Sequence, residues 1–401
     1  MTPKPANPAH MHETEGRSSS GPAQVAGEDG GPTAPVAGEA VGGHGLGRLG
    51  GMVAGPMSRR GFFGSSAALV GAVGLGSLLE ACSSSSPTPS AKPSVVTRRT
   101  SLTLQLDFLP LGRYAPYYYA AERGFYSRRN LDVSIQPSTG TGPALEQLVA
   151  GRVQALFVDI PSMMDLMGKD PHPQMRSYAV LYAKAPETVF FFEGGSIKTP
   201  KDLDGKTIAT SPGSTDFELF PLFAKANGID YGSIHWDEVA ASAKVSLLLE
   251  HKVDATTTYI MGLPDAEAGL SPGEKLGTFT YGDYGVNVYG NGIVFADSYA
   301  RSNPDVVKAF VEASLEGYVA AFANPEAAVS AMAAQVPSLK PAVAVKEIAI
   351  VKQLAYGPAQ RVHGIGYQDP AVMKNCYDAV VEELHQHIGL PLDSLYSDAY
   401  V

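Results

Sequence analysis

Residues 102–133 of the chain read LTLQLDFLPLGRYAPYYYAAERGFYSRRNLDV. Leu102, Leu104 and Leu106 alternate with polar residues, and this period of two predicts a β-strand with one buried face. The proline and glycine that follow interrupt the strand and predict a loop. Pro116 then suits the first turn of a helix, because an N–H at that position has no partner within the helix. The stretch therefore predicts a strand, a loop and a helix in succession.

Four tyrosines crowd this predicted strand-to-helix junction. In open α/β sheets, small ligands bind beyond the carboxyl ends of the strands, where the next helix begins. A helix with one side toward a core cannot bury three consecutive side chains, and Tyr117, Tyr118 and Tyr119 are consecutive. We therefore expect the junction to form the floor of a binding cleft, with Tyr114, Tyr117 and Tyr118 among its walls. The alternative is that these tyrosines are ordinary core residues.

Length and charge limit the class of protein. A chain of 401 residues is long enough for two lobes with substantial cores. Its formal net charge is −10 and it contains no basic run, which argues against a nucleic-acid partner. We expect a monomer that binds a small molecule.

The first hundred residues carry export features. Residues 1–56 are rich in Gly, Pro, Ala and Ser, which predicts disorder. A pair of arginines, a short apolar run and small residues then precede Cys82, which is the layout of an export signal. The apolar run is too short to span a bilayer, and the arginine pair resembles a twin-arginine signal. We assign residues 57–82 to a twin-arginine lipoprotein signal.

The sequence Leu-Glu-Ala-Cys that ends this signal resembles a bacterial lipobox. The resemblance implies that Cys82 is lipid-modified and anchors the exported protein to the outer face of the cell membrane. That role leaves no intramolecular disulfide, and Cys376 is expected to be a small buried helix residue. Residues 83–100 are rich in Ser, Pro and Thr and predict a tether. We expect translation to begin at Met57 or Met52.

Beyond the tether, strands alternate with helices, which predicts an α/β fold with mostly parallel sheets. The alternation separates a first lobe, made from residues 101–192 and 291–401, from a second lobe made from residues 193–290. Two connections between two α/β lobes form a hinge, and closure about a hinge can trap a ligand. Within the second lobe, one helix is expected over residues 216–227, with Gly228 as its C-terminal cap.

Several residues of the opening stretch resemble a known family. Phe108 and Pro110 precede Tyr-Ala-Pro-Tyr-Tyr at 114–118 and Gly-Phe-Tyr at 124–126. This pattern resembles the type II periplasmic-binding superfamily, in the branch that binds thiamine pyrimidine precursor, riboflavin, sulfonates and taurine. The resemblance covers about residues 102–401. It implies a two-lobed fold with a hinge, and delivery of a small ligand to the permease and ATPase subunits of an ABC importer.

The same resemblance leaves several ligands open. The Tyr-Ala-Pro-Tyr-Tyr run is closest to the riboflavin-type pattern, whereas the pyrimidine-precursor pattern has Asn and His where this chain has Leu111 and Tyr114. A flat, neutral heteroaromatic compound such as a flavin or a pyrimidine vitamin precursor is the leading class. A sulfonate or another organic anion is the alternative, and Arg113 is the nearby cation that would bind it. An enzyme acting on a pyrimidine precursor is a third reading, but this sequence lacks the cysteine cluster of the related synthase.

Other loops after strands add candidate ligand contacts. Two glycine loops precede helix N-termini, where N–H groups and the helix dipole can hold an oxygen atom. Carboxylates and amides at strand ends can bond to ring N–H or C=O groups, although an aspartate there often caps the next helix. Aromatic walls suit a flat ring. The expected ligand-binding residues are Asp107, Phe108, Tyr114, Tyr117, Tyr118, Gly140, Thr141, Asp159, Gly213, Ser214, Thr215, Tyr259, Tyr284 and Asn291.

Catalytic, metal and cofactor motifs are not found in the sequence. Leu145 stands where a dinucleotide fingerprint requires glycine, and Pro200 stands at the first glycine of a P-loop. His385 and His387 are two residues apart on a helix predicted over residues 370–387, so they point to different faces and would not share a metal. We expect a binding protein without catalytic activity, cofactor or metal.

Overall fold

The computed structural model describes residues 99–170 and 174–401, which lie within one compact unit of the chain. The expected disorder of residues 1–56, the signal at 57–82 with its lipid-modified cysteine, the start of translation and nearly all of the tether lie outside the described residues. In the part of the chain that is described, no helix is long and apolar enough to cross a membrane.

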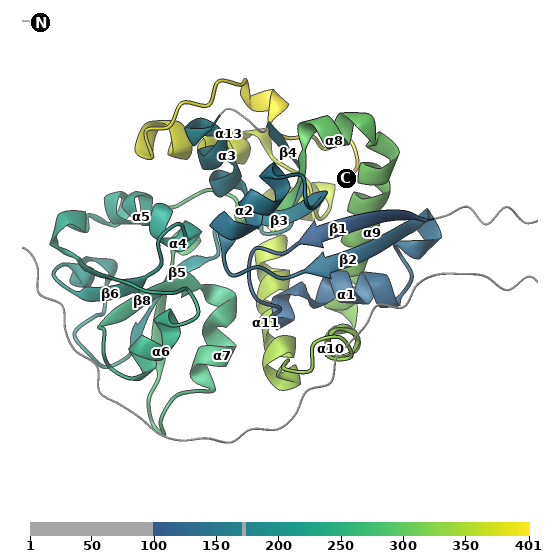
Figure 1. Ribbon diagram of the computed structural model, residues 1–401. Coiled ribbons are helices and arrows are strands. Elements are labelled where there is room, and N and C mark those ends of the chain that lie inside the picture. Colours follow the sequence, from purple (N-terminus) through teal and green to yellow (C-terminus); the bar gives the residue numbers. More distant parts are fainter. Residues whose placement is uncertain (1–98, 171–173) are drawn as a thin grey trace, which may run out of the picture. The chain divides into compact units, whose positions relative to one another are not determined.

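The strands of the described ranges form two five-stranded sheets, and each sheet is the centre of one lobe (Figure 1). The first sheet has the order β2-β1-β3-β10-β4. β1 runs parallel to β2 and to β3, whereas β10 runs antiparallel to β3 and to β4. Its strands are β1 (Thr100–Gln105), β2 (Leu131–Gln136), β3 (Ala155–Asp159), β4 (Met175–Val180) and β10 (Asn291–Ala296).

The second sheet repeats this plan in the order β7-β6-β8-β5-β9. β6 runs parallel to β7 and β8, and β5 runs antiparallel to β8 and β9. Its strands are β5 (Glu187–Phe192), β6 (Thr207–Thr210), β7 (His235–Glu238), β8 (Ala255–Tyr259) and β9 (Leu276–Thr280).

The chain crosses between the sheets twice, from β4 into β5 and from β9 into β10. Each antiparallel strand is therefore the one that has just arrived from the other lobe. The predicted pair of α/β lobes is confirmed. The assignment of residues 187–192 to the first lobe was wrong, because β5 pairs with β8 and β9 in the second sheet. Val189 and Phe190 are both fully buried, so a strand this apolar suits either sheet and its composition does not identify its partners.

Helices cover the faces of both sheets. In the first lobe they are α1 (Ala115–Glu122), α2 (Thr141–Val149), α3 (Ile160–Lys169), α8 (Asp297–Ser302), α9 (Pro304–Ala323), α10 (Pro325–Ala333), α11 (Pro341–Ala355), α12 (Pro358–His363) and α13 (Pro370–Asp378). In the second lobe they are α4 (Thr215–Glu218), α5 (Phe220–Asn227), α6 (Lys244–Leu249) and α7 (Leu263–Glu267). Many of these helices begin at proline, which leaves no N–H unpaired at the first position.

The tyrosines of α1 are buried more completely than the sequence predicted. Tyr117, Tyr118 and Tyr119 are 0%, 4% and 5% exposed. The expectation that three consecutive tyrosines cannot all be buried was wrong, because α1 packs on the first sheet and also against α9 and α10. The Tyr117 ring lies 5.7 Å from the ring of Phe157 on β3 and 5.3 Å from the ring of Tyr318 on α9. A helix covered on several sides can bury residues all around its axis.

Two helix predictions differ from the structure in their boundaries. The single helix expected over residues 216–227 is divided into α4 and α5 at Leu219, since Pro221 lacks the N–H that would continue it. Gly228 caps α5 with a φ of 64°, as predicted. The helix expected over residues 370–387 ends at Asp378 and continues only as a π-helical turn, Ala379–Glu383.

The two histidines near the C-terminus therefore lie beyond the helix, and His385 has a φ of 56°. The prediction that His385 and His387 lie on different faces of one helix was therefore wrong, because neither residue is in a helix. Cys376 is fully buried within α13, which confirms the prediction for that residue.

Packing between α1 and α9 requires glycine at position 317. A Cβ there would lie 2.6 Å from the Cβ of Ala120 and 2.8 Å from the carbonyl oxygen of Pro116. We predict that Gly317→Ala lowers the free energy of unfolding by about 1–3 kcal/mol, because the two backbones must separate. Urea denaturation measures this change. Gly142→Ala in α2 is the control, because nothing lies within 4 Å of its Cβ position; equal effects of both substitutions would contradict the close-packing account.

Candidate functional site

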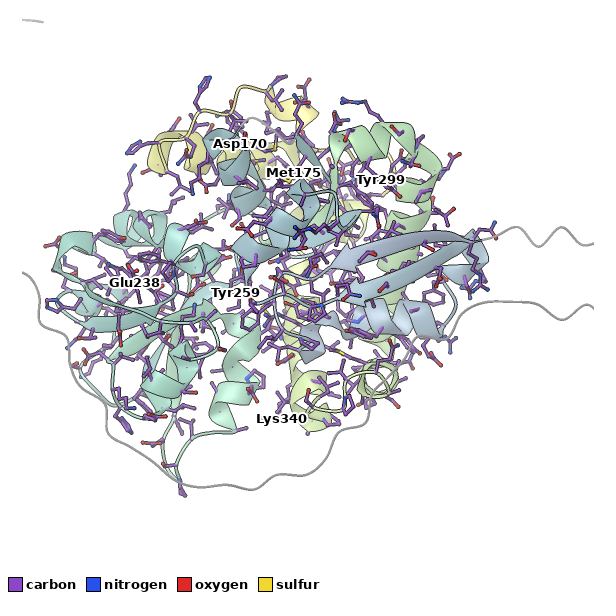
Figure 2. The ribbon with its side chains drawn as sticks, viewed as in Figure 1. Asp170, Met175, Glu238, Tyr259, Tyr299 and Lys340 are labelled. Atoms are coloured by element: carbon purple, nitrogen blue, oxygen red, sulfur yellow. The ribbon has the colours of Figure 1, made fainter. Side chains whose placement is uncertain are left out.

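A cavity of about 420 Å³ lies between the lobes, a volume within the usual range for small-molecule sites. The first lobe borders it with the loop after β1, the start of α2 and residues of α11. The second lobe borders it with the N-terminal turns of α4 and α6, the end of β8 and part of α7. Figure 2 labels Tyr259, which borders the cavity from β8, and Lys340, which borders it just before α11.

Seven of the residues expected from the sequence border this cavity. They come from both lobes and include both glycine-loop helix starts. These residues are Asp107, Phe108, Gly140, Thr141, Ser214, Thr215 and Tyr259.

The other expected residues lie behind the cavity wall or away from it. Tyr114, Tyr117, Tyr118, Asp159, Gly213, Tyr284 and Asn291 do not border the cavity. Tyr114 and Asn291 contact a residue that does border it, whereas Tyr284 packs against Phe223 and Phe279 in the second lobe.

Asp107 is the centre of a buried polar cluster at the end of β1. Its Oδ1 accepts a hydrogen bond from the hydroxyl of Tyr114 at 2.8 Å, and its Oδ2 accepts one from Nδ2 of Asn291 at 3.0 Å. Asn291 is the first residue of β10, the strand that returns from the second lobe. The carboxylate therefore connects three parts of the fold, which are the end of β1, the start of α1 and the start of β10, where the chain returns from the second lobe. Burial raises the pKa of Asp107, while the charge of Arg113 and both hydrogen bonds lower it.

Arg113 lies beside this carboxylate and is only 6% exposed. Its guanidinium carbon is 5.0 Å from the ring centre of Tyr114, 5.7 Å from that of Phe108 and 5.8 Å from that of Tyr259. A guanidinium close to aromatic faces gains cation–π attraction. Arg113 is thus held at the cavity wall by rings from both lobes.

Glu347 of α11 fixes the loop that carries Arg113. Its Oε2 accepts a hydrogen bond from the backbone N–H of Arg113 at 2.9 Å. The loop approaches so closely that a Cβ on Gly112 would lie 2.3 Å from the Cα of Ala344. Burial raises the pKa of the Glu347 carboxyl to about 7, and Arg113 offsets part of that effect.

The second lobe places a buried ion pair on its side of the cavity. Lys244, at the start of α6, pairs with Asp216 near the start of α4, and both side chains are buried. Burial alone would raise the pKa of Asp216, but Lys244 and neighbouring hydroxyls outweigh burial and lower it. The backbone carbonyl of Asp216 also accepts a hydrogen bond from Tyr281 at 2.7 Å. This wall is fixed and its two charges cancel.

Two contacts bridge the lobes at the edges of the cavity. The hydroxyls of Ser162 in α3 and Thr215 in α4 lie 2.9 Å apart and are buried. Lys340 donates to the Asp265 carboxylate in α7 at 2.7 Å, with both side chains exposed. The lobes are therefore in contact at two separate places.

Asp159 caps the N-terminus of α3, which is the alternative role that the sequence offered for an aspartate at a strand end. Its Oδ1 accepts a hydrogen bond from the N–H of Ser162 at 2.8 Å, which caps α3. Among the described residues, its Oδ2 has no hydrogen-bond partner. Burial raises its pKa to about 8, and burial together with Asp159 raises that of Glu187.

Sequence reasoning missed several residues of the wall, including Lys244, Asp216 and Glu347. A single charged residue in a helical stretch resembles a solvated surface position, so the sequence does not distinguish these three. Gly112 was only a faint sign of the close approach to α11, because a glycine near a proline also marks an ordinary loop. Only the packing of α11 on this loop brings Glu347 to the site. In residues 99–170 and 174–401, no group of His, Cys, Asp or Glu side chains is arranged to hold a metal ion.

Solved structures share this two-lobed fold. The alkanesulfonate-binding protein SsuA of Xanthomonas axonopodis pv. citri matches 75% of this chain and 99% of its own, with 14% identity and a TM-score of 0.58. A ligand-binding component of an ABC-type import system from Staphylococcus aureus matches 75% and 98%, with 15% identity and a TM-score of 0.58. The protein therefore has the two-lobed α/β fold of type II periplasmic-binding proteins.

The family follows from the sequence match. Residues 112–328 match the model described as NMT1/THI5 like, and the chain belongs to that family. The riboflavin-binding protein RibY of Chloroflexus aurantiacus is 25% identical over 63% of this chain and 73% of its own length. A formylaminopyrimidine-binding protein of Halalkalibacterium halodurans is 23% identical over 58% of this chain and 69% of its own. The resemblance seen in the opening stretch is confirmed.

The hydrogen bond from Tyr114 to Asp107 should contribute to stability. We predict that Tyr114→Phe lowers the free energy of unfolding by about 1–3 kcal/mol, because a buried carboxylate oxygen loses its donor. The control is Tyr182→Phe, since the buried Tyr182 hydroxyl has no partner among the described residues and its loss should change stability by less than about 0.5 kcal/mol. Chemical denaturation of both variants measures the difference; equal losses would show that the Asp107 cluster is not stabilising.

Glu347 should make stability depend on pH. Its pKa rises from an ordinary value of 4.5 to about 7 in the folded protein, so folding takes up a proton between these values. The stability that this protonated carboxyl adds to the folded protein is fully present below about pH 4.5 and is lost as the pH rises through about 7. We predict that Glu347→Gln removes this decline in the free energy of unfolding, which amounts to about 3 kcal/mol at most.

The measurement is urea denaturation of wild type and variant at several values between about pH 5 and about pH 8. Glu326→Gln, at an exposed position on α10, is the matched control and should keep the wild-type profile. Parallel profiles for wild type and Glu347→Gln would contradict the raised pKa.

Proposed function

We propose that this protein is the solute-binding component of an ABC-type importer, without catalytic activity, and that it binds a flat, neutral heteroaromatic ligand between its lobes. The leading ligands are a flavin or a pyrimidine vitamin precursor. The observation that carries the proposal is the cavity wall itself, in which Phe108 and Tyr259 come from opposite lobes and border one space of about 420 Å³. Two aromatic walls suit a flat ring.

The charges of the wall support a neutral ligand. The charged side chains that border the cavity are four carboxyls, Asp107, Asp216, Asp265 and Glu347, and three cations, Arg113, Lys244 and Lys340. Each cation faces a carboxyl within this set. A sulfonate would need a cation that is free to neutralise it, so the wall favours uncharged compounds over the organic anions considered from the sequence.

Comparison with relatives supports the same class. One relative is named for binding riboflavin and another for binding formylaminopyrimidine. Each of these two ligands contains a flat nitrogen heterocycle. We propose that Asp107, Phe108, Gly140, Thr141, Ser214, Thr215 and Tyr259 contact the ligand directly. In the same proposal, Tyr114 and Asn291 act from behind the wall through their hydrogen bonds to Asp107. The other expected residues do not touch the ligand; these are Tyr117, Tyr118, Asp159, Gly213 and Tyr284.

Phe108 offers a direct test. We predict that Phe108→Ala weakens the binding of riboflavin or formylaminopyrimidine about 10- to 100-fold, because a ring contact and its burial are lost. Isothermal titration gives the dissociation constants, and circular dichroism confirms that the variant is folded. Phe192→Ala is the control, because Phe192 is also half-buried but stacks on His251, 4.3 Å away in the second lobe, outside the cavity. Equal affinities for wild type and Phe108→Ala would refute the site.

We also propose that the protein is exported and lipid-anchored, with the signal at residues 57–82 and the tether at 83–100. This part rests on the lipobox-like sequence before Cys82. Cys82→Ser should move the protein from the membrane fraction to the soluble fraction, as measured by fractionation of cells that express it. Cys376→Ser, which changes a buried thiol in α13, should leave the partition unchanged. Membrane association that survives Cys82→Ser would exclude lipid attachment there.

A further inference from the structure

Arg113 carries hydrogen-bond donors that the protein itself does not use. The residue borders the cavity and is 6% exposed. Within the described part of the chain, its backbone N–H bonds to Glu347, but no group accepts a hydrogen bond from its guanidinium. A guanidinium has five N–H donors in a planar fork, and buried donors without partners are costly. Water or a ligand in the cavity can accept hydrogen bonds from them.

The carboxylate beside Arg113 already accepts hydrogen bonds from the protein. Both oxygens of Asp107 accept hydrogen bonds, one from Tyr114 and one from Asn291. At this wall, the guanidinium of Arg113 therefore contributes free donors. A ligand edge that fits here presents acceptor atoms, because an N–H pointed at the guanidinium would leave two donors facing each other.

The charge around Arg113 determines what kind of acceptor fits. Asp107 and Glu347 both interact electrostatically with the guanidinium and raise its pKa. Two carboxyls already balance the positive charge, so a full anion would bring excess negative charge into a buried site. Carbonyl oxygens on an uncharged ring provide acceptors without that charge.

We infer that Arg113 donates hydrogen bonds to carbonyl oxygens on the edge of a neutral ring, so that this site selects oxo-substituted heterocycles over amino-substituted pyrimidines. The inference rests on the proposed function and names the ligand class of that same cavity. In a flavin, one carbonyl oxygen of the pyrimidinedione ring lies beside an unprotonated nitrogen of the central ring, so one edge presents two adjacent acceptors, whereas an aminopyrimidine presents an N–H donor beside a ring nitrogen. The planar fork of arginine matches two acceptors on one edge.

The aromatic residues around Arg113 strengthen this selection. Phe108, Tyr114 and Tyr259 surround the guanidinium at 5.0–5.8 Å and limit the water that can reach it. Hydrogen bonds in such a low-dielectric place are stronger than in water. Phe108 and Tyr259 also border the cavity, so they can hold the faces of the ring whose edge meets Arg113.

The first test varies the ligand and leaves the protein intact. Purified full-length chain is titrated with lumichrome, a three-ring compound with two carbonyl groups, and with phenazine, a three-ring compound without them. Tryptophan and ligand fluorescence report binding. We expect lumichrome to bind at least about 10-fold more tightly than phenazine, as a charge-assisted hydrogen bond requires. Equal affinities would overturn the role of the carbonyl groups.

The second test varies Arg113. Arg113→Met should weaken lumichrome and riboflavin about 10- to 100-fold and leave phenazine unchanged. Because that variant leaves two buried carboxyls without a cation, Arg113→Lys provides a second measurement that keeps the charge but loses the planar fork, and it should weaken lumichrome about 10-fold. Lys346→Met, an exposed cation next to Glu347 in sequence, is the control and should bind like wild type. Thermal unfolding reports whether each variant is folded.

The outcomes separate this inference from the function on which it rests. If wild type binds formylaminopyrimidine but not riboflavin or lumichrome, the vitamin-binding function stands and the role of Arg113 is refuted. If riboflavin binds equally to wild type and to folded Arg113→Lys and Arg113→Met, the same conclusion follows. If taurine binds and depends on Arg113, the site is an anion site and both proposals are refuted. Binding of none of these compounds to wild type would refute the proposed ligand classes as a whole.

Discussion

The carboxylate of Asp107 joins the parts of this protein that must remain fixed. Its two oxygens hold Tyr114 at the start of α1 and Asn291 at the start of β10, so one buried group ties the first strand to the strand that returns from the second lobe. A buried carboxylate is costly unless it is paired and hydrogen-bonded, and here Arg113 supplies the charge. The two oxygens of Asp107 therefore connect the cavity wall of the first lobe to the second crossing, from β9 into β10.

Arg113 is held in turn by Glu347, which α11 delivers to a loop that tolerates only glycine at position 112. The first lobe thus presents a preorganised surface in which the guanidinium of Arg113 lies beside the rings of Phe108 and Tyr114. The second lobe adds Tyr259 and a self-neutralised pair, Asp216 with Lys244. The contacts between Ser162 and Thr215 and between Lys340 and Asp265 bridge the lobes, and the two walls border one cavity.

Features encoded by neighbouring residues were predictable from the sequence. The alternation of β1, the proline at the start of α1, the glycine that caps α5 and the two glycine loops are local patterns, and each lies where it was expected. Features that depend on distant packing were not. The burial of Tyr117, Tyr118 and Tyr119 depends on α9 and α10, the sheet that contains β5 depends on its partners, and the role of Glu347 depends on the approach of α11.

The account depends most on the chemical nature of the natural ligand. The most direct measurement is mass spectrometry of the small molecule released by denaturing the protein purified from its own cells. The account predicts an uncharged, flat nitrogen heterocycle that carries ring carbonyl groups. A sulfonate or another organic anion in its place would contradict it.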